Sequence, residues 1–389
     1  MARVLVLGGG FAGLEAAIYL RKEGIEVTLV SDRDYFYIYP TSIWIPTGEA
    51  TREEVSVPLA QLADKHGFEL IVDAVKHIEA EARRVTLQSG RVLEGYDALV
   101  IAIGQGKVQA EGIEHTVSIC GKPEEADALH DRLQELVAKG SGRIAMGFGG
   151  NPKDTSAVRG GPAFEVLFNV HNFLKKKGLR DKFTLTFFAP MDKPGQKMGD
   201  KALAMMDKMF AMTHIERKVG SKIVRFESDG IVFEDGDKLM SDMTMFIPAG
   251  TGHPVLKHSD LPLSDAGFVV TNEYNEVEGF DGVYAIGDSA ALMGPSWRAK
   301  QGHVAEVMAR NTAYNIAQAF KGGSERKSYK EHLNILCVMD TGDGAAFVYR
   351  NEKGGTIVPM PFIGHWLKKG WGWYCRNSKL DRIPRLPGM

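Results

Sequence analysis

Short apolar runs separated by polar turns mark the expected strands of this chain, and two of them lie at its N-terminus. Residues 4–7 are all Val or Leu, and residues 25–30 form a second run with polar residues at only two positions. Runs that are apolar at nearly every position are typical of parallel strands buried on both faces. The alanine-rich stretch between them has a helical pattern, so we expect the chain to open with a strand, a helix and a second strand.

Similar runs recur along the chain and extend this α/β pattern. Residues 72–86 alternate between apolar and polar positions as an antiparallel strand pair would, and residues 87–91 have the composition of a hairpin turn. Helices are expected to begin at Gly161, where Pro162 suits the first turn, and at Gln301. Buried strands are expected at 96–104, 143–150, 183–188, 243–250 and 282–289.

The order of these elements predicts two α/β units, the second inserted into the first. A chain of 389 residues is longer than one hydrophobic core usually holds. The expected fold therefore has two Rossmann-like dinucleotide-binding domains and a C-terminal segment. The first domain is expected to be discontinuous, with residues 1–107 and 238–320. The second is expected to cover 108–237, and the C-terminal segment 321–389.

Charge and composition argue against several classes of protein. The 47 Lys and Arg residues are balanced by 49 Asp and Glu residues, so no overall basic field favours nucleic acid as a partner. The three cysteines are scattered, without the spacing of a disulfide scaffold or a metal site. No signal peptide or membrane-spanning run is recognisable, so a start in the cytoplasm is the default.

A glycine motif joins the first strand to its helix. Gly8, Gly10 and Gly13 form Gly-x-Gly-x-x-Gly around Phe11 and Ala12. The first glycine suits a tight turn, the second lets a pyrophosphate approach the backbone, and the third lets the helix pack closely on the strand. The helix N-terminus adds amide donors and a positive dipole. The motif therefore predicts a bound dinucleotide.

Other ends of strands and helices in the same unit also suit a nucleotide. Ser31 or Asp32, at the end of the second strand, could bind a ribose, although an ordinary turn would have a similar composition. Asp288 could accept a hydrogen bond from a ribityl hydroxyl or cap the segment that follows it. The helix from Gln301 could direct its positive end at a flavin pyrimidine edge, with the charge of Lys300 beside it.

These nucleotide elements can converge only in a discontinuous domain, which is the layout of flavoproteins with two dinucleotide domains. FAD is the ligand that this layout suits best. Residues 34–46, with five aromatic side chains around two prolines, could form a rigid wall beside its ring or a loop packed on the core. The residues expected to contact FAD are Gly8, Gly10, Phe11, Ala12, Gly13, Ser31, Asp32, Pro40, Ala102, Gly104, Gly287, Asp288, Lys300 and Gln301.

The second unit lacks a complete glycine motif. Gly147 and Gly149 follow its first strand, but no third glycine stands at the required spacing, and the next strand ends at 188–190 without an acidic residue. An NAD(P)H site in this unit is therefore disfavoured.

The C-terminal segment carries an amphipathic pattern. Three of the five tryptophans fall in residues 361–375. At helical spacing, one face has aromatic and aliphatic residues from Phe362 to Tyr374, and the other has His365, Lys368, Lys369 and Arg376. Such a helix could lie in a membrane interface or dock on the core or on a second subunit, and we favour the membrane.

With these residues placed, the chain resembles the sulfide:quinone oxidoreductases, which are related to flavocytochrome c sulfide dehydrogenase and type II NADH dehydrogenase. The resemblance covers nearly the full length and implies an FAD enzyme bound peripherally to the membrane, where these enzymes often form homo-oligomers. It also implies that sulfide is oxidised on one face of the flavin and quinone is reduced on the other, with a cysteine pair carrying sulfur. The motifs that carry it are 31–40, 117–120, 161–165, 180–188 and 337–347.

The chain departs from the family pattern at the thiols. Cys337 matches one member of the cysteine pair, and Cys120 matches a third cysteine that holds the flavin or carries sulfur in some members. The partner cysteine belongs in residues 157–160, which contain none, and two expected histidines are also absent. Cys120 could act as the partner, Cys337 could work with an external thiol, or the sulfide chemistry could be lost. Cys337 could also be an inert buried cysteine.

Three functions follow from these features. The first is a membrane-associated FAD oxidoreductase that passes electrons from sulfide, or a related sulfur species, to quinone. The second is an NAD(P)H:quinone oxidoreductase of the same fold, and the third is a diverged flavoprotein that senses redox state or binds a partner. For the first, the expected catalytic residues are Cys337, Cys120, Glu165 as a proton relay and Lys300 as a stabiliser of reduced flavin.

Overall fold

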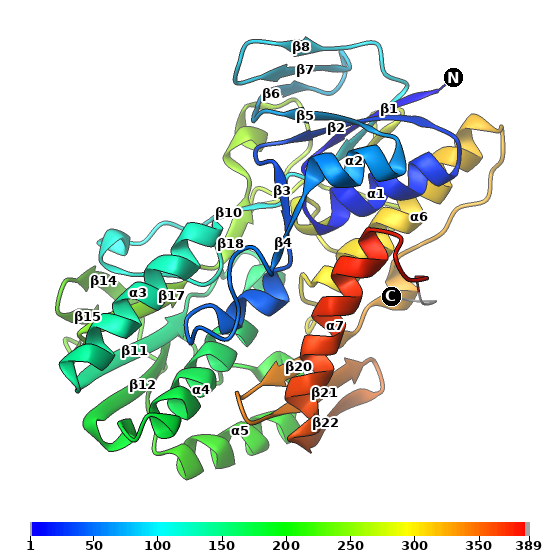
Figure 1. The fold of residues 1–389 in the computed structure, drawn as a ribbon. Coiled ribbons are helices and arrows are strands. Elements are labelled where there is room, and N and C mark those ends of the chain that lie inside the picture. The colour runs from blue at the N-terminus through cyan, green and yellow to red at the C-terminus, as the bar shows by residue number, and fades with distance from the viewer. Residues whose placement is uncertain (1, 386–389) are drawn as a thin grey trace.

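A parallel sheet built from distant parts of the chain forms one half of the molecule (Figure 1). The protein is represented by a computed structural model that describes residues 2–385. The strand order is β19-β9-β1-β2-β5, and helices α1 (Phe11–Lys22) and α6 (Gly302–Phe320) pack on each other beside the sheet. The strands are β1 (Arg3–Leu7), β2 (Glu26–Ser31), β5 (Glu69–Val72), β9 (Ala98–Ile101) and β19 (Val283–Ala285).

A second parallel sheet has the order β13-β12-β11-β17. It combines β11 (Gly142–Phe148), β12 (Phe183–Ala189) and β13 (Glu216–Val219) with β17 (Met243–Ile247). Its helices are α3 (Pro123–Lys139), α4 (Gly161–Lys176) and α5 (Asp200–Thr213). The chain crosses between the two halves at an antiparallel pair, β10 (Gln105–Lys107) and β18 (Gly250–Gly252).

Smaller elements flank these two sheets. They are the pair β3 (Tyr35–Tyr37) and β4 (Ser56–Pro58), the helix α2 (Leu59–His66), and two antiparallel three-stranded sheets: β6 (Val75–Glu79), β7 (Arg84–Leu87) and β8 (Val92–Leu93); and β14 (Ile223–Glu227), β15 (Gly230–Phe233) and β16 (Lys238–Met240).

Two of our expectations about the strands need correction. The run 243–250 was expected to return to the first unit, but β17 pairs with β11, and residues 238–240 pair with β15. A fully apolar strand has the same pattern in either sheet, so its own residues do not specify its partner. We therefore propose that the first domain resumes after β17 rather than at 238. The run 72–86 is likewise divided, because Val72 ends β5 and the antiparallel pair is β6 with β7.

The aromatic segment 34–46 is packed into the cores of both halves. Successive side chains of β3 point to opposite sides, and Trp44 follows in the 3₁₀ helix Tyr39–Trp44. Phe36 and Ile38 belong to the core of the first sheet, whereas Tyr37 and Trp44 belong to the core around the second sheet. For these residues the core interpretation is therefore the one that the structure bears out, and the segment ties the two halves together.

The C-terminal residues form a three-stranded antiparallel sheet and one helix, α7 (Ile363–Lys379). The strands are β20 (Ile335–Asp340), β21 (Gly344–Asn351) and β22 (Gly354–Pro361). Figure 1 shows α7 running from this sheet toward α6. Glycine weakens a helix, but a Cβ at Gly372 would lie 2.5 Å from Cγ2 of Thr41. Gly372 therefore permits a close approach of α7 to the segment 39–44.

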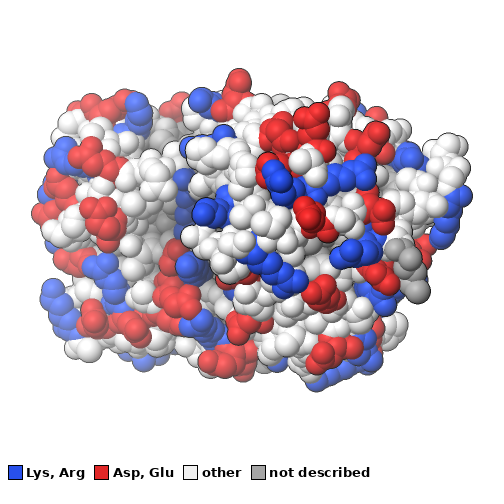
Figure 2. All heavy atoms as spheres, turned by 90° about the horizontal axis from the view of Figure 1, so that it is seen from above, with Lys and Arg blue, Asp and Glu red and all other residues white. Residues whose placement is uncertain are grey.

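Opposite charges are interspersed over the surface that Figure 2 shows. No single sign of charge dominates that face, as expected for a chain whose acidic and basic residues nearly balance.

Candidate functional site

The glycine loop after β1 has separate packing and binding positions. A Cβ at Gly8 would lie 2.2 Å from the carbonyl oxygen of Ala102, and one at Gly13 would lie 1.8 Å from the carbonyl oxygen of Gly8. Both glycines are therefore required by close backbone contacts. A Cβ at Gly10 would meet no atom within 4 Å. The loop thus leaves space at the N-terminus of α1, where the pyrophosphate of FAD fits.

The loops at the carboxyl ends of β1, β9 and β19 meet at this place. The Ser289 hydroxyl donates to the carbonyl oxygen of Gly104 at 3.2 Å, and a Cβ at Gly287 would lie 2.7 Å from Cβ of Ala12. Gly104 has a φ of 75° and also opens onto free space. Three segments far apart in the sequence therefore surround the space next to Gly10. The open backbone at Gly10 and Gly104, together with the amide donors at the start of α1, fits FAD.

The structure describes four other expected FAD contacts. Ser31 is buried, and a Cβ at Gly9 would lie 2.6 Å from its hydroxyl oxygen, whereas Asp32 is exposed. Phe11 packs edge-to-face on Phe36, with ring centroids 4.9 Å apart. Pro40 is half-buried in the first turn of the short 3₁₀ helix Tyr39–Trp44.

Asp288 is paired with an arginine that the sequence did not single out. The Arg159 guanidinium forms an ion pair with the Asp288 carboxylate. Burial lowers the pKa of Arg159, but the Asp288 charge raises it above its ordinary value, so Arg159 stays charged. Arg159 stands in the segment 157–160, where the partner cysteine was expected. The sequence does show a basic residue where the family has a cysteine. It does not show that this residue pairs with Asp288, which lies far along the chain.

Cys120 lies beside this pair. Burial raises the pKa of its thiol, while Arg159 and Lys107 lower it. None of the three cysteines, all within the described residues, is in a disulfide.

Lys300 holds the turn that carries Asp288. Its ammonium donates to the carbonyl oxygens of Asp288, at 3.2 Å, and Ala290, and it lies 4.0 Å from the Phe268 ring centroid. Burial lowers the pKa of Lys300 to about 8. Lys300 therefore lies next to the expected ribityl contact, with its ammonium directed at backbone carbonyls.

Gln301 links the N-terminus of α6 to the strand of Cys337. Its side-chain amide donates to the carbonyl oxygen of Leu336 and accepts from the Leu336 N–H, each at 3.4 Å. Leu336 immediately precedes Cys337 on β20. The strand that carries the thiol is therefore held close to the helix start that was expected to face the flavin.

A buried cluster, which we call the Glu165 cluster, joins α4 and α7 to the strand of Cys337. Lys368 donates to Glu165 Oε1, which also accepts from the Asp340 N–H at 2.8 Å. His365 Nδ1 lies 2.8 Å from Asp340 Oδ2. Burial raises the pKa of Cys337 to about 12, with a further increase from the Glu165 charge and a decrease from Lys368. The thiol is thus protonated at rest rather than preset as a thiolate. The Glu165 cluster consists of Glu165, Asp340, His365 and Lys368.

The sequence predicted the two faces of α7, and the structure shows which one points inward. The face with His365 and Lys368 is buried, and Lys379, at the end of the helix, binds Glu15 and Glu306. None of the helices among residues 2–385 is long and apolar enough to cross a bilayer. The large exposed apolar residues at the start of and along α7 are Phe362, Ile363, Trp366, Leu367 and Trp373, with exposed fractions from 51% to 78%.

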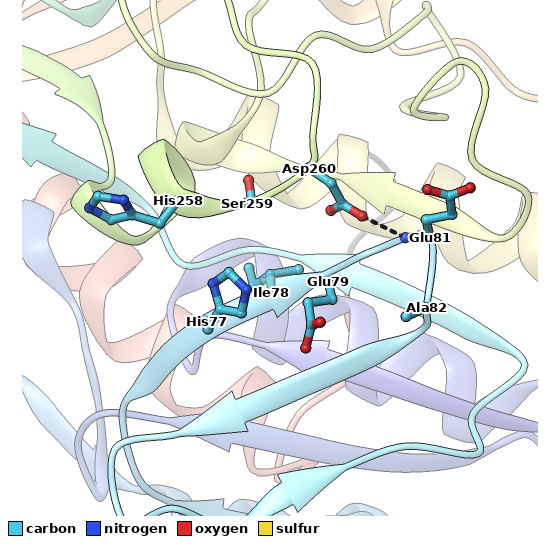
Figure 3. A pocket seen from close by; sticks show the side chains of 8 residues that line it. All are labelled: His77, Ile78, Glu79, Glu81, Ala82, His258, Ser259 and Asp260. Carbon is cyan, nitrogen blue, oxygen red and sulfur yellow. Dashed lines mark hydrogen bonds between the residues drawn. The ribbon is translucent and has the colours of Figure 1, made fainter.

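The hollow in Figure 3 lies away from these residues. It has a volume of about 520 Å³ and is lined by His77, Glu79, His258 and Asp260, among others. The Asp260 carboxylate accepts from the N–H groups of Ala80 and Glu81, so it holds the β6–β7 turn. No residue expected at the flavin site lines this hollow.

Comparisons with known proteins agree with the fold. The chain is 29% identical to the sulfide-quinone reductase of Aquifex aeolicus, over 97% of this chain and 92% of that protein. It is 24% identical to a type II NADH:quinone oxidoreductase of Staphylococcus epidermidis, over 91% of each.

Solved structures agree as well. The sulfide:quinone oxidoreductase from Aquifex aeolicus has a TM-score of 0.87 at 27% identity, covering 98% of this chain and 92% of that chain. NDH2 from Plasmodium falciparum, at 12% identity and a TM-score of 0.74, covers 100% of this chain and 99% of that chain, and shares the fold. The model of the family described as "Pyridine nucleotide-disulphide oxidoreductase" matches residues 2–314. The chain therefore belongs to the pyridine nucleotide-disulphide oxidoreductase family and is an FAD-dependent oxidoreductase.

Proposed function

We propose that this protein passes electrons from sulfide, or a related sulfur species, through FAD to quinone. The observation that carries the proposal is the position of Cys337. Gln301 ties its strand to the N-terminus of α6, and Glu165 and Lys368 flank the thiol. The relative in Aquifex aeolicus, which matches nearly the whole chain, is named for sulfide and quinone.

Each residue of the site has its own role in the proposed reaction. FAD, when bound, supplies the two-electron relay between donor and quinone. Gly10 would leave room for its pyrophosphate, Asp288 would accept a hydrogen bond from its ribityl chain, and Lys300 holds the turn of Asp288. Cys337 is the thiol that would form an S–S bond with the sulfur of the donor. Its S–H bond would break, Glu165 is the nearby group that can take this proton, and the two electrons released by the S–S bond formation would go to oxidised FAD.

Cys337 is proposed to work with an external sulfur acceptor. Cys120 has Arg159 and Lys107 as its cationic neighbours, whereas Cys337 has Glu165 and Lys368. The two thiols therefore have different charged surroundings. With no cysteine in residues 157–160, sulfur on Cys337 would pass to a small thiol or to a second sulfide.

The alternative donor, NAD(P)H, is favoured by the names of the staphylococcal relatives but not by the second glycine segment. A Cβ at Gly147 would lie 2.1 Å from the Phe188 carbonyl oxygen, and one at Gly149 would lie 3.0 Å from the Phe246 ring. These glycines are explained by packing between neighbouring strands. Neither leaves open space comparable to that at Gly10.

We also propose that the protein binds the membrane surface through α7. Its apolar face exposes Trp366 by 69% and Trp373 by 61%, while its polar face is turned inward. Exposed aromatic side chains in such a row are typical of surfaces that enter the headgroup region. Quinone is a lipid-soluble acceptor, so this face suits its delivery.

The donor is tested by mixing the anaerobic, FAD-loaded protein with sulfide or with NADH in a stopped-flow instrument. We expect sulfide to bleach the flavin absorbance within seconds and a quinone analogue to restore it. Bleaching by NADH but not by sulfide would assign the protein to the alternative function.

A further inference from the structure

A buried ion pair joins α7 to α4 beside the strand that carries Cys337. Lys368 and Glu165 are 5% and 4% exposed, and the ammonium donates to Glu165 Oε1. The same oxygen accepts from the N–H of Asp340 at 2.8 Å, three residues after Cys337. Little solvent reaches either charge, so removing one partner would leave the other buried and uncompensated.

The two charges of this pair act on the Cys337 thiol in opposite senses. Burial raises the pKa of the thiol most, the Glu165 carboxylate raises it further, and the Lys368 ammonium lowers it. Burial also raises the pKa of Glu165, which Lys368 opposes. Without Lys368, the pKa of Glu165 would be higher. Glu165 would then more often be protonated already and unable to take the proton of Cys337.

The other charged groups around the pair are themselves matched. Asp340 faces His365 at 2.8 Å, and His365 Nε2 lies 3.5 Å from Glu49 at the surface. Lys369, the residue after Lys368, pairs with the same Glu49 at 3.4 Å and is only half-buried. Lys368 is therefore the cation of α7 directed at Glu165, and Lys369 is a neighbour of the same charge directed elsewhere.

We propose that Lys368 is a positioning residue of the thiol site: its ammonium keeps Glu165 as a carboxylate, and that carboxylate takes the proton of Cys337. In this step the S–H bond of Cys337 breaks, an O–H bond forms on Glu165, and the electron pair remains on sulfur as a thiolate. The proposal rests on the proposed function and identifies the residue that prepares its thiol. In this proposal α7 has two roles: its exposed aromatic face binds the membrane surface, and its buried face supplies Lys368 to the thiol site.

The test measures alkylation of Cys337 by iodoacetamide in the FAD-loaded protein, between pH 7 and pH 10. Because the thiolate is the reacting form, the rate reports the proton affinity of this cysteine. Mass spectrometry of the peptide that contains Cys337 separates it from Cys120. The variants are Glu165→Gln, Lys368→Met, Lys368→Arg, the double variant with Gln and Met, and Lys369→Met as the matched control.

At pH 9, Glu165→Gln leaves the ammonium unopposed, and alkylation is expected to be at least about threefold faster than in the wild type, since one pKa unit corresponds to a tenfold change in thiolate fraction. Lys368→Met removes the ammonium that lowers the pKa of Cys337, so the rate should fall by a similar factor. Lys368→Arg and Lys369→Met should match the wild type. If the ion pair had only a structural role, Glu165→Gln and Lys368→Met would change the alkylation rate of Cys337 in the same direction. That result would overturn the proposal.

Where Lys368→Met alone does not fold, the double variant tests the same ammonium. It should be alkylated more slowly than Glu165→Gln, and equal rates would overturn the proposal. The outcome is independent of sulfide turnover. A protein whose alkylation follows the expected order, but whose flavin is not reduced by sulfide, would support the role of Lys368 and contradict the proposed function.

Discussion

Single glycines in the first loop have different physical tasks. Gly13→Ala places a Cβ 1.8 Å from the Gly8 carbonyl oxygen, so we expect it to lower the free energy of unfolding, by about 2–3 kcal/mol for overpacking, and to lose flavin. Gly10→Ala meets no protein atom within 4 Å. It should keep the stability of the apoprotein and bind FAD more weakly. Thermal unfolding of the apoproteins and the ratio of flavin to protein absorbance check both effects. An equal loss of stability in the two variants would contradict this division.

Residue types were predicted better than residue partners. Gly10, Asp288 and Cys337 could be proposed as site residues because their local motifs carry a signal. Arg159 and Lys368 could not, because each acquires its role from a side chain that lies more than a hundred residues away. No local pattern encodes such a pairing.

At the scale of elements, α7 shows both the reach and the limit of pattern reading. Its two faces could be predicted from the helical spacing, because spacing depends only on the sequence of the helix. Which face is buried depends on Glu15 and Glu165 of other helices, and these carboxylates attract the polar face inward. The strand β17 shows the same limit, because its apolar pattern fits either sheet.

The C-terminal end of α7 should become less stable in acid. Burial raises the pKa of Glu15, but Lys379, Arg385 and Arg310 lower it to about 2. The unfolded chain therefore takes up this proton at a higher pH than the folded chain does. The stabilisation is complete above the ordinary value of 4.5 and is lost as the pH falls through 2, about 3 kcal/mol in all.

Denaturant unfolding between pH 2 and pH 6 measures this loss. The free energy of unfolding of Glu15→Gln should depend less on pH than that of the wild type. Glu23→Gln, at the exposed C-terminal end of α1, is the control and should follow the wild type. A wild-type stability that does not change between pH 5 and pH 2 would contradict the assignment to Glu15.

The exposed face of α7 should control attachment to lipid. Replacing Trp366 and Trp373 by Ser removes two large exposed side chains from α7. We expect binding to anionic vesicles to fall at least about tenfold, given the apolar area that each indole buries. Val92→Ser, on β8, removes an exposed apolar residue from the other side of the molecule and serves as the control. Sedimentation with vesicles measures the bound fraction, and equal binding of both variants would exclude α7 as the attachment surface.

At the scale of the whole molecule, two parallel sheets from interleaved parts of the chain support one site between distant segments. The fold class could be predicted because apolar runs and glycine motifs report buried strands and their turns. The pairing of β17 with β11, on which our proposed domain boundary depends, could not be predicted, because an apolar strand fits either sheet. The family shown by the comparisons fixes FAD as the cofactor, whereas the donor depends on Cys337 and its neighbours.

The central claim, that Cys337 carries electrons from sulfide to the flavin, is tested most directly by single-turnover reduction. The anaerobic FAD-loaded wild type, Cys337→Ser and Cys120→Ser are mixed with sulfide, and the flavin absorbance is followed. The account predicts bleaching within seconds for the wild type and for Cys120→Ser, and no bleaching on that time scale for Cys337→Ser, with all three retaining FAD. Bleaching of Cys337→Ser at the wild-type rate would contradict it.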